Sequence, residues 1–446
     1  MDINLFIDRL FEKAKEEQFE AAEVWVGESE AFSVKCIEGS IDDYKVSRSG
    51  GLGLRALVNG KMGYASTQAY DDDAIMQLID GVRESAELNE SPEQDEIYAG
   101  DSEYPTIKKD ATDIFTVTPE EKIAAAERMD AAVLTCDSRI TKTKGSVVST
   151  GTGRTLLRNT YGLCLEDSAA YCVAYTGAVA PRGDSVVSAY DMGCGLSFGE
   201  LDPEQIARNA VRRTIDQLDA APVSAGEYRI IFEREAMCDL LQTFCGIFSA
   251  ENAQRKLSLL QGKEGEKIAS DAVTLVDDPL MKGGYATSAF DAEGSAARTK
   301  AVIENGVLKT LLHSRKTARI QGVETTGNAS RAGYASPITV APTNFYFKPG
   351  EKTLDGLQQQ MGDGLVILEI SGLHAGANAV SGDFSLLAKG YAVKDGKRTH
   401  AVEQITIAGN FYRVLENIRE VGSDLLFPGS GIGSPSVDVG TLVVSA

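Results

Sequence analysis

The stretch IIFEREAMCDLLQTF, residues 230–244, joins a predicted strand to a predicted helix at the start of the second half of the chain. When the helix is advanced by 100° per residue, one broad face is entirely apolar. That face contains Ala236, Met237, Leu240, Leu241, Phe244, Ile247 and Phe248, and the narrow opposite stripe contains Glu235, Asp239, Gln242 and Gly246. The pattern predicts an amphipathic helix whose polar stripe faces water.

The segment APVSAGEY, residues 221–228, lies just before this strand and predicts a domain boundary. Beyond it the chain alternates short apolar runs with the turn pairs Asn305–Gly306 and Asp395–Gly396. Such pairs favour two-residue hairpins, because both turn positions need positive φ. Residues 222–446 are therefore predicted to form a β-rich domain with hairpins.

Residues 1–221 are predicted to form an α+β region in which a helix, a β-meander and a second helix occur twice. The possible sub-units are 1–90, with a hairpin at Asn59–Gly60, and 118–221, which begins with the capping-box residues Thr118 and Glu121. A polar, acidic connector covers 91–117. The repetition fits either a weak internal duplication or a common α+β pattern, and the fold class is α+β in both cases.

The charge balance argues against nucleic acid and anionic membranes as partners. The chain carries 44 Lys and Arg against 65 Asp and Glu, a formal net charge of −21, without a strong basic cluster. No apolar run is long enough for a transmembrane helix. Because the N-terminus predicts an acidic amphipathic helix and not a signal peptide, we expect a cytoplasmic protein.

Metal ligands are scarce in the sequence. The seven cysteines are odd in number and include no CxxC pair, which argues against a disulfide framework or a structural zinc site. The three histidines, His313, His374 and His400, are far apart in sequence. Glu235 and Asp239 could offer two carboxylates, but without histidine we expect no metal in this chain.

Four motifs follow one another between residues 276 and 331: DDP at 277–279, FDAEG at 290–294, IENGVLKTLL at 303–312 and TTGNASR at 325–331. In this order and spacing they resemble the TldD/PmbA family, also known as the modulator of DNA gyrase family, and the resemblance covers essentially the whole chain. The family implies a cytoplasmic heteromeric peptidase that cleaves unfolded or extended peptides in an enclosed cavity. Nothing in the sequence indicates contact with DNA.

The resemblance also implies two subunit types. The TldD type carries a His-Glu-x-x-x-His helix and a later cysteine that bind the metal, whereas the PmbA type, also called TldE, lacks these ligands. Here Arg234 and Asp239 stand at the two histidine positions, and only Glu235, the vestigial catalytic glutamate, is retained. The stretch FPGSGIGSPSVDVG, residues 427–440, has no cysteine. An arginine also places a permanent positive charge where a cation would bind.

These departures imply a non-catalytic PmbA/TldE-type subunit. Zinc or iron is then expected only in a TldD-type catalytic partner, and the isolated chain could form a homodimer. Ligands at i and i+5 lie about 140° apart on a regular helix, so the metal-binding version needs a local distortion. This chain is expected to keep a regular helix.

The segment SGLHAGANAVSGDFSLLAKGY, residues 371–391, resembles the PmbA-type signature. Its polar residues are candidates for lining a peptide cavity shared with the partner: His374, Asn378, Ser381, Asp383 and Ser385. The alternative is a tight turn whose polar side chains bond their own backbone. Ser381, His374 and Asp383 could also be assembled as a hydrolase triad, which only geometry can decide.

Two further functions remain open from the sequence. One is a stand-alone homodimeric module that binds peptide without cutting it, through an exposed sheet edge. The other is an independent peptidase or hydrolase with an unrecognised site. His313 and His400 lie in or beside predicted strands, where a structural or exposed role is expected.

Overall fold

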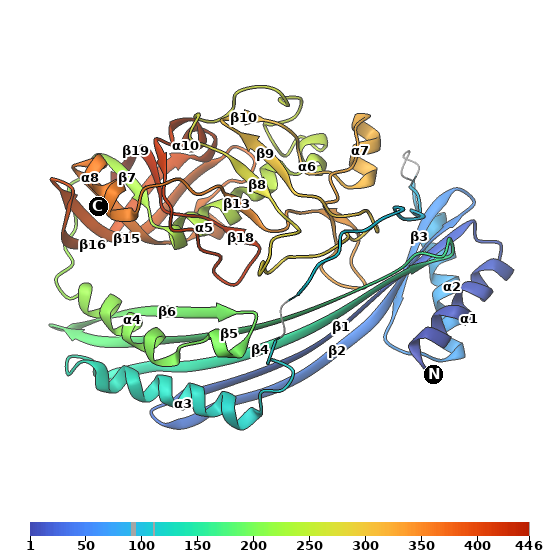
Figure 1. Cartoon of the computed structure of the whole chain (residues 1–446), viewed down its shortest axis with the longest axis horizontal. Coiled ribbons are helices and arrows are strands. Elements are labelled where there is room, and N and C mark those ends of the chain that lie inside the picture. Colours follow the sequence, from blue (N-terminus) through green and yellow to red (C-terminus); the bar gives the residue numbers. More distant parts are fainter. Residues whose placement is uncertain (91–94, 110–111, 446) are drawn as a thin grey trace.

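Both halves of the N-terminal region build one six-stranded antiparallel sheet, in the order β3-β2-β1-β4-β5-β6 (Figure 1). The computed structural model describes residues 1–90, 95–109 and 112–445; part of the predicted connector, 91–94 and 110–111, lies outside the described residues. The strands are β1 Ala21–Ile37, β2 Ser40–Val58, β3 Lys61–Thr67, β4 Lys142–Asn159, β5 Cys164–Arg182 and β6 Ser185–Gly195. The two halves join where β1 pairs with β4 from Glu23↔Asn159 to Cys36↔Ser146.

Two helix pairs cover one face of this sheet at its opposite ends. The helices are α1 Ile3–Glu16, α2 Asp72–Glu87, α3 Pro119–Cys136 and α4 Pro203–Asp216. Because side chains alternate across a strand, even-numbered residues of β1 face the helices. Val24 packs in the first helix-covered cluster and Val34 in the second. The odd-numbered face is left for the C-terminal domain, which lies over it in Figure 1.

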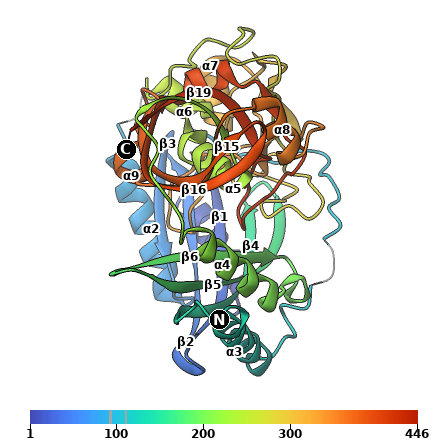
Figure 2. The same cartoon turned by 90° about the vertical axis from the view of Figure 1, so that its left-hand side faces the viewer.

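The C-terminal domain contains a mixed sheet in the order β16-β15-β14-β7-β19-β17. Its strands are β7 Gly226–Phe232, β14 Gly364–Ser371, β15 Asp383–Lys394, β16 Lys397–Asn410, β17 Glu420–Val421 and β19 Val437–Ser445. Because β16 also pairs with β19, five of these strands close into a ring, visible in Figure 2.

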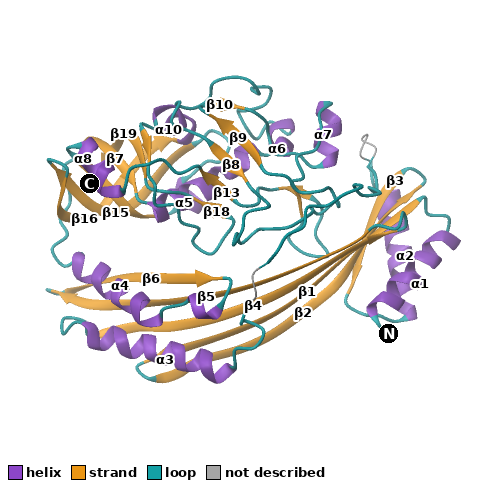
Figure 3. Cartoon of the chain, in the orientation of Figure 1, coloured by secondary structure: helices purple, strands orange, loops and turns teal. Residues whose placement is uncertain are grey.

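A second sheet of this domain has the order β10-β9-β8-β13-β18. Its strands are β8 Leu275–Asp277, β9 Lys300–Glu304, β10 Val307–Leu308, β13 Phe345–Phe347 and β18 Ile432–Gly433, with a separate pair β11 Ala329–Ser330 and β12 Thr339–Val340. The helices are α5 Arg234–Phe244, α6 Ala250–Gln254, α7 Arg315–Gln321, α8 Leu354–Met361, α9 Leu373–Gly376 and α10 Phe411–Asn417, and long loops join the elements (Figure 3).

The architecture confirms the predicted α+β class and β-rich C-terminal half. All three predicted hairpin turns are present with positive φ, as at Asn59 (52°) and Gly60 (72°). Thr118 and Glu121 form the predicted capping box at the start of α3. Among the described residues, no helix is long and apolar enough to cross a membrane.

Candidate functional site

Helix α5 begins immediately after β7 and is a regular α-helix from Arg234 to Phe244. Its N-cap residue is Glu233, whose carboxylate accepts a hydrogen bond from the backbone N–H of Glu235 at 3.0 Å. The predicted apolar face is fully buried, with Met237, Leu240 and Phe244 at 0% exposure. The prediction of a regular amphipathic helix is therefore confirmed as far as Phe244. Ile247 and Phe248 of the predicted face lie in a 3-10 helix, Cys245–Phe248, that follows α5.

Two residues of the polar stripe, Glu235 and Asp239, face a cavity of 430 Å³ between the two domains. Gln242, further along the same stripe, is exposed to water as the helical pattern predicts. Glu235 and Asp239 line it from α5, and Glu369, Lys389 and Arg398 line it from the strand ring. The N-terminal sheet and α4 supply the opposite wall, with Tyr175, Tyr190, Asp191, Met192, Arg213 and Asp216. The N-terminal sheet and α4 therefore turn the first part of this stripe into one wall of a partly open cavity.

Glu235 is held by an arginine from the other domain. Both terminal nitrogens of Arg213 donate to its carboxylate, at 2.8 Å and 2.7 Å, which is the strong bidentate geometry. Arg213 also lies 3.2 Å from Asp191, whose second oxygen accepts from Asn209 at 3.1 Å. Burial raises the pKa of Asp191 in spite of Arg213. Glu235 is thus engaged by a guanidinium, which leaves it poorly placed to act as a general base.

Asp239 lies one helical turn from Glu235 and has a different environment. Among the described residues, its carboxylate forms no ion pair or side-chain hydrogen bond. Burial, together with the neighbouring carboxylates Glu235 and Glu369, raises the pKa of Asp239 to about 6. Burial and Glu235 likewise raise the pKa of Glu233 to about 7. Strongly shifted carboxyl groups beside a cavity are typical of functional sites.

The residues of α5 do not fit a catalytic metal. On a regular helix Arg234 and Asp239 point about 140° apart, so their side chains cannot converge on one ion. The Nε atom of Arg234 lies 3.3 Å from Glu233 and is buried without a hydrogen-bond partner. Throughout residues 1–90, 95–109 and 112–445, no group of three or more His, Cys, Asp and Glu side chains is arranged to hold a metal ion.

None of the candidates between residues 374 and 385 lines the cavity. Of the wider segment 371–391, only Lys389 and Gly390, in the middle of β15, belong to the lining. The turn is bonded to itself. Asn378 accepts from the backbone N–H groups of Val380 and Ser381, at 2.9 Å and 3.1 Å. Asn410 donates to Asp383 at 2.8 Å. These bonds explain Asn378 and Asp383 as residues of a local turn. That the turn also faces a partner's cavity stays a prediction.

The possible hydrolase triad of Ser381, His374 and Asp383 does not form in this turn. Ser381 Oγ donates to Asp383 at 2.8 Å and so contacts the acid directly, without a base between them. His374 is exposed, as is Ser385, and within the described chain neither forms a side-chain hydrogen bond. The hydrogen bonds from Asn410 and Ser381 lower the pKa of Asp383, as expected for an ionised turn residue.

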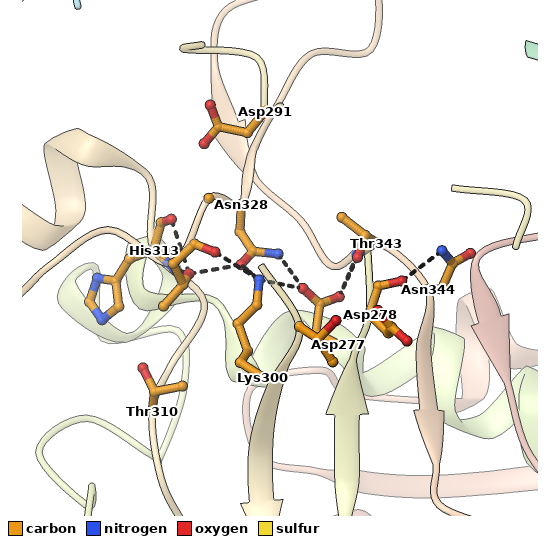
Figure 4. Close-up of polar contacts among 12 residues, drawn as sticks. Asp277, Asp278, Asp291, Lys300, Thr310, His313, Asn328, Thr343 and Asn344 are labelled. Carbon is orange, nitrogen blue, oxygen red and sulfur yellow. Dashed lines mark hydrogen bonds and ion pairs between the residues drawn. The ribbon is translucent and has the colours of Figure 1, made fainter. Parts of the chain in front are cut away.

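The motif-rich segment 276–331 forms a buried polar network in the C-terminal domain (Figure 4). Asp277, with 0% exposure, accepts from Asn328 at 2.8 Å and lies 2.9 Å from the Lys300 ammonium. Its other oxygen accepts from the N–H and hydroxyl of Thr343, at 2.6 Å and 2.9 Å. Both oxygens of Asp277 are satisfied by these partners, so the contacts hold the surrounding loops together. His313 lies beside it and is buried, whereas His400 is exposed.

Sequence reasoning missed the residues that complete the cavity, above all Arg213, Asp191 and Glu369. Arg213 and Glu369 lie far from each other in sequence and on different domains. The helical pattern of α4 does not distinguish Arg213 from the other arginines of that helix. Only the packing of the domains reveals these contacts.

Comparison with known proteins identifies related chains along the whole length. Residues 22–86, 112–218 and 225–446 match domain 1, the central domain and the C-terminal domain of the PmbA/TldA metallopeptidases. The chain is 27% identical to a protein named metalloprotease PmbA from Escherichia coli, over 91% of this chain and 88% of that protein. It is 28% identical to a protein named metalloprotease from Methanothermobacter thermautotrophicus, over 92% and 89%.

Solved structures share the fold. A Thermotoga maritima protein described as a proposed modulator of a DNA gyrase superposes with a TM-score of 0.92 at 31% identity, covering 100% of both chains. TldE from Thermococcus kodakarensis superposes with a TM-score of 0.90 at 21% identity, covering 99% of this chain and 100% of that one.

Proposed function

Because this chain belongs to the PmbA/TldD metallopeptidase family, we propose that it is a PmbA/TldE-type subunit that does not itself catalyse hydrolysis. In this proposal it works with a TldD-type catalytic subunit, in the cytoplasm, on unfolded or extended peptides. The partner holds the zinc or iron, and this chain contributes binding surface for the peptide. A homodimer is proposed for the chain in isolation.

The proposal rests on the side chains that α5 presents at the positions of the metal ligands. Its metal-equivalent positions hold Arg234 and Asp239 on a regular helix, and its glutamate is locked by Arg213. A metal would supply Lewis-acid activation of water in a catalytic subunit, but these side chains offer it no ligand set. In this proposal the chain holds and orients part of a peptide in the cavity beside α5.

The test is co-purification of this chain with a TldD-type subunit, followed by metal analysis and an unfolded-peptide cleavage assay on each fraction. We expect this chain alone to be inactive and metal-free, and activity with stoichiometric metal in the complex. Chelator-sensitive cleavage by this chain alone would refute the proposal, as would failure of the two chains to associate.

A stand-alone peptide-binding module is the second candidate, because the cavity is formed by a single chain. It requires micromolar peptide binding without a partner and without turnover. A flat titration of the isolated chain with unfolded peptides would eliminate this candidate and leave the subunit role untouched.

A further inference from the structure

The charge inventory of the inter-domain cavity is unbalanced. Its lining contains five carboxylates, Asp191, Asp216, Glu235, Asp239 and Glu369, against three cations, Arg213, Lys389 and Arg398.

Each lining cation is already paired inside the cavity. Arg213 binds Glu235 and Asp191, as described above. Arg398 lies 2.9 Å from Asp216, and Lys389 lies 3.5 Å from Glu369. Within the described lining, Asp239 is thus the carboxylate left without a cation. Asp239 is partly buried, so its unpaired carboxylate has a desolvation cost that is relieved when a positive group binds beside it.

The wall opposite α5 has the apolar character that the stem of a long cationic side chain needs. Tyr175 and Met192 pair across β5 and β6 and remain 40% and 48% exposed, although both line a cavity. Tyr190 is 49% exposed, and the ammonium of Lys144 lies 5.5 Å from its ring centre. In the part of the chain that the structure describes, no cation lies over the ring of Tyr175. Aromatic faces attract cations, and the methylene stems of lysine and arginine pack on such surfaces.

We propose that this cavity recognises a lysine or arginine side chain of an extended peptide, with Asp239 as its ionic partner and Tyr175 and Met192 as the wall for its stem. The proposal rests on the proposed function, because it takes a peptide as the occupant. It adds a substrate class, peptides with a basic residue. It also gives Asp239, which stands at a histidine position of the TldD-type metal helix, a role in binding the peptide.

The test measures binding of fluorescently labelled, glycine- and serine-rich decapeptides to the full chain and to its complex with the TldD-type subunit. The peptides differ only at a central lysine, acetyl-lysine or glutamate. We expect the lysine peptide to bind about tenfold more tightly than the acetyl-lysine peptide, as befits one partly desolvated charge pair. The Asp239→Asn variant should lose this preference, and Asp239→Lys should transfer it to the glutamate peptide.

Asp271→Asn is the matched control, because it removes one carboxylate from an 83%-exposed site of the same domain and reports non-specific attraction to this acidic chain. It should keep the preference. Equal binding of lysine and acetyl-lysine peptides, or equal loss in both asparagine variants, overturns the inference. Neither outcome affects the subunit role, which is judged by association and metal analysis.

Discussion

At the scale of single residues, the site depends on which carboxylate has a cation. Glu235 and Asp239 lie one turn apart on the same stripe of α5, yet Arg213 binds only the first. The second is left in a cavity with other carboxylates, and its pKa rises to about 6. The sequence places both acids on one face correctly, but it contains no signal for the unequal pairing.

Replacing Asp239 by asparagine should stabilise the protein at neutral pH. The pKa of this carboxyl rises from 3.8 to about 6 on folding, so the folded state binds a proton that the unfolded chain has lost. Ionisation therefore destabilises the fold progressively as pH increases between these values, and the penalty persists above about 6. We expect Asp239→Asn to add about 1 kcal/mol at pH 7.5, reduced from the full shift because the cavity admits solvent.

Thermal melting of both proteins at pH 7.5 and below pH 4 checks this expectation. The difference in Tm should be present at pH 7.5 and absent at the acidic pH, and Asp271→Asn should show no comparable gain. Equal melting temperatures of wild type and Asp239→Asn at pH 7.5 would show that the ionised Asp239 carboxylate does not destabilise the folded protein.

At the scale of elements, the N-terminal sheet has two different faces. Helices cover its even face, and the loop around Tyr334 packs on the odd face, where only glycine leaves enough space. A Cβ atom at Gly53 would lie 1.9 Å from the carbonyl oxygen of Tyr334, and one at Gly51 would lie 2.4 Å from its ring. Glycine in a strand interior, otherwise unfavourable, here permits close approach of the two domains.

Gly53→Ala should destabilise the protein by about 1–3 kcal/mol, since the sheet or the Tyr334 loop must move. Gly153→Ala is its matched control on the same face, because a Cβ there meets nothing closer than Glu28 O at 3.8 Å. We expect that variant to be neutral or slightly stabilised. Chemical denaturation of both variants measures the difference in the free energy of unfolding. Similar midpoints for the two variants would contradict the prediction and show that the Tyr334 loop moves at little cost.

At the scale of the whole molecule, a buried ion cluster connects the two domains. Glu23 of β1 has 0% exposure and accepts from Arg55 Nε at 2.7 Å and from Arg331 Nη2 at 2.8 Å. Arg331 ends the TTGNASR motif, so one of the motifs that carry the family resemblance also fixes the C-terminal domain on the sheet. This contact is separate from the Arg213–Glu235 pair, which lines the cavity and also joins the two domains.

Glu23→Ala should cost about 3–5 kcal/mol, because two guanidinium groups remain buried with their shared anion removed. Glu30→Ala provides the comparison on the same strand, since its ion pair with Arg48 is largely exposed and should contribute less than about 1 kcal/mol. Equilibrium denaturation distinguishes the two. If both substitutions cost the same, the cluster does not stabilise the domain contact.

The sequence by itself determined the α+β class, the hairpin turns, the α3 cap and the apolar face of α5. These features are local, because turn φ angles, caps and helical periodicity depend on residues a few positions apart. The motifs also identified the family. Only the tertiary structure decided that Glu235 and Asp239 of α5 line a cavity, that Arg213 neutralises Glu235, and that Asp239 has no cationic partner among the described residues. Those facts arise from contacts between residues of different domains, whose energies depend on burial and distance that no sequence pattern encodes.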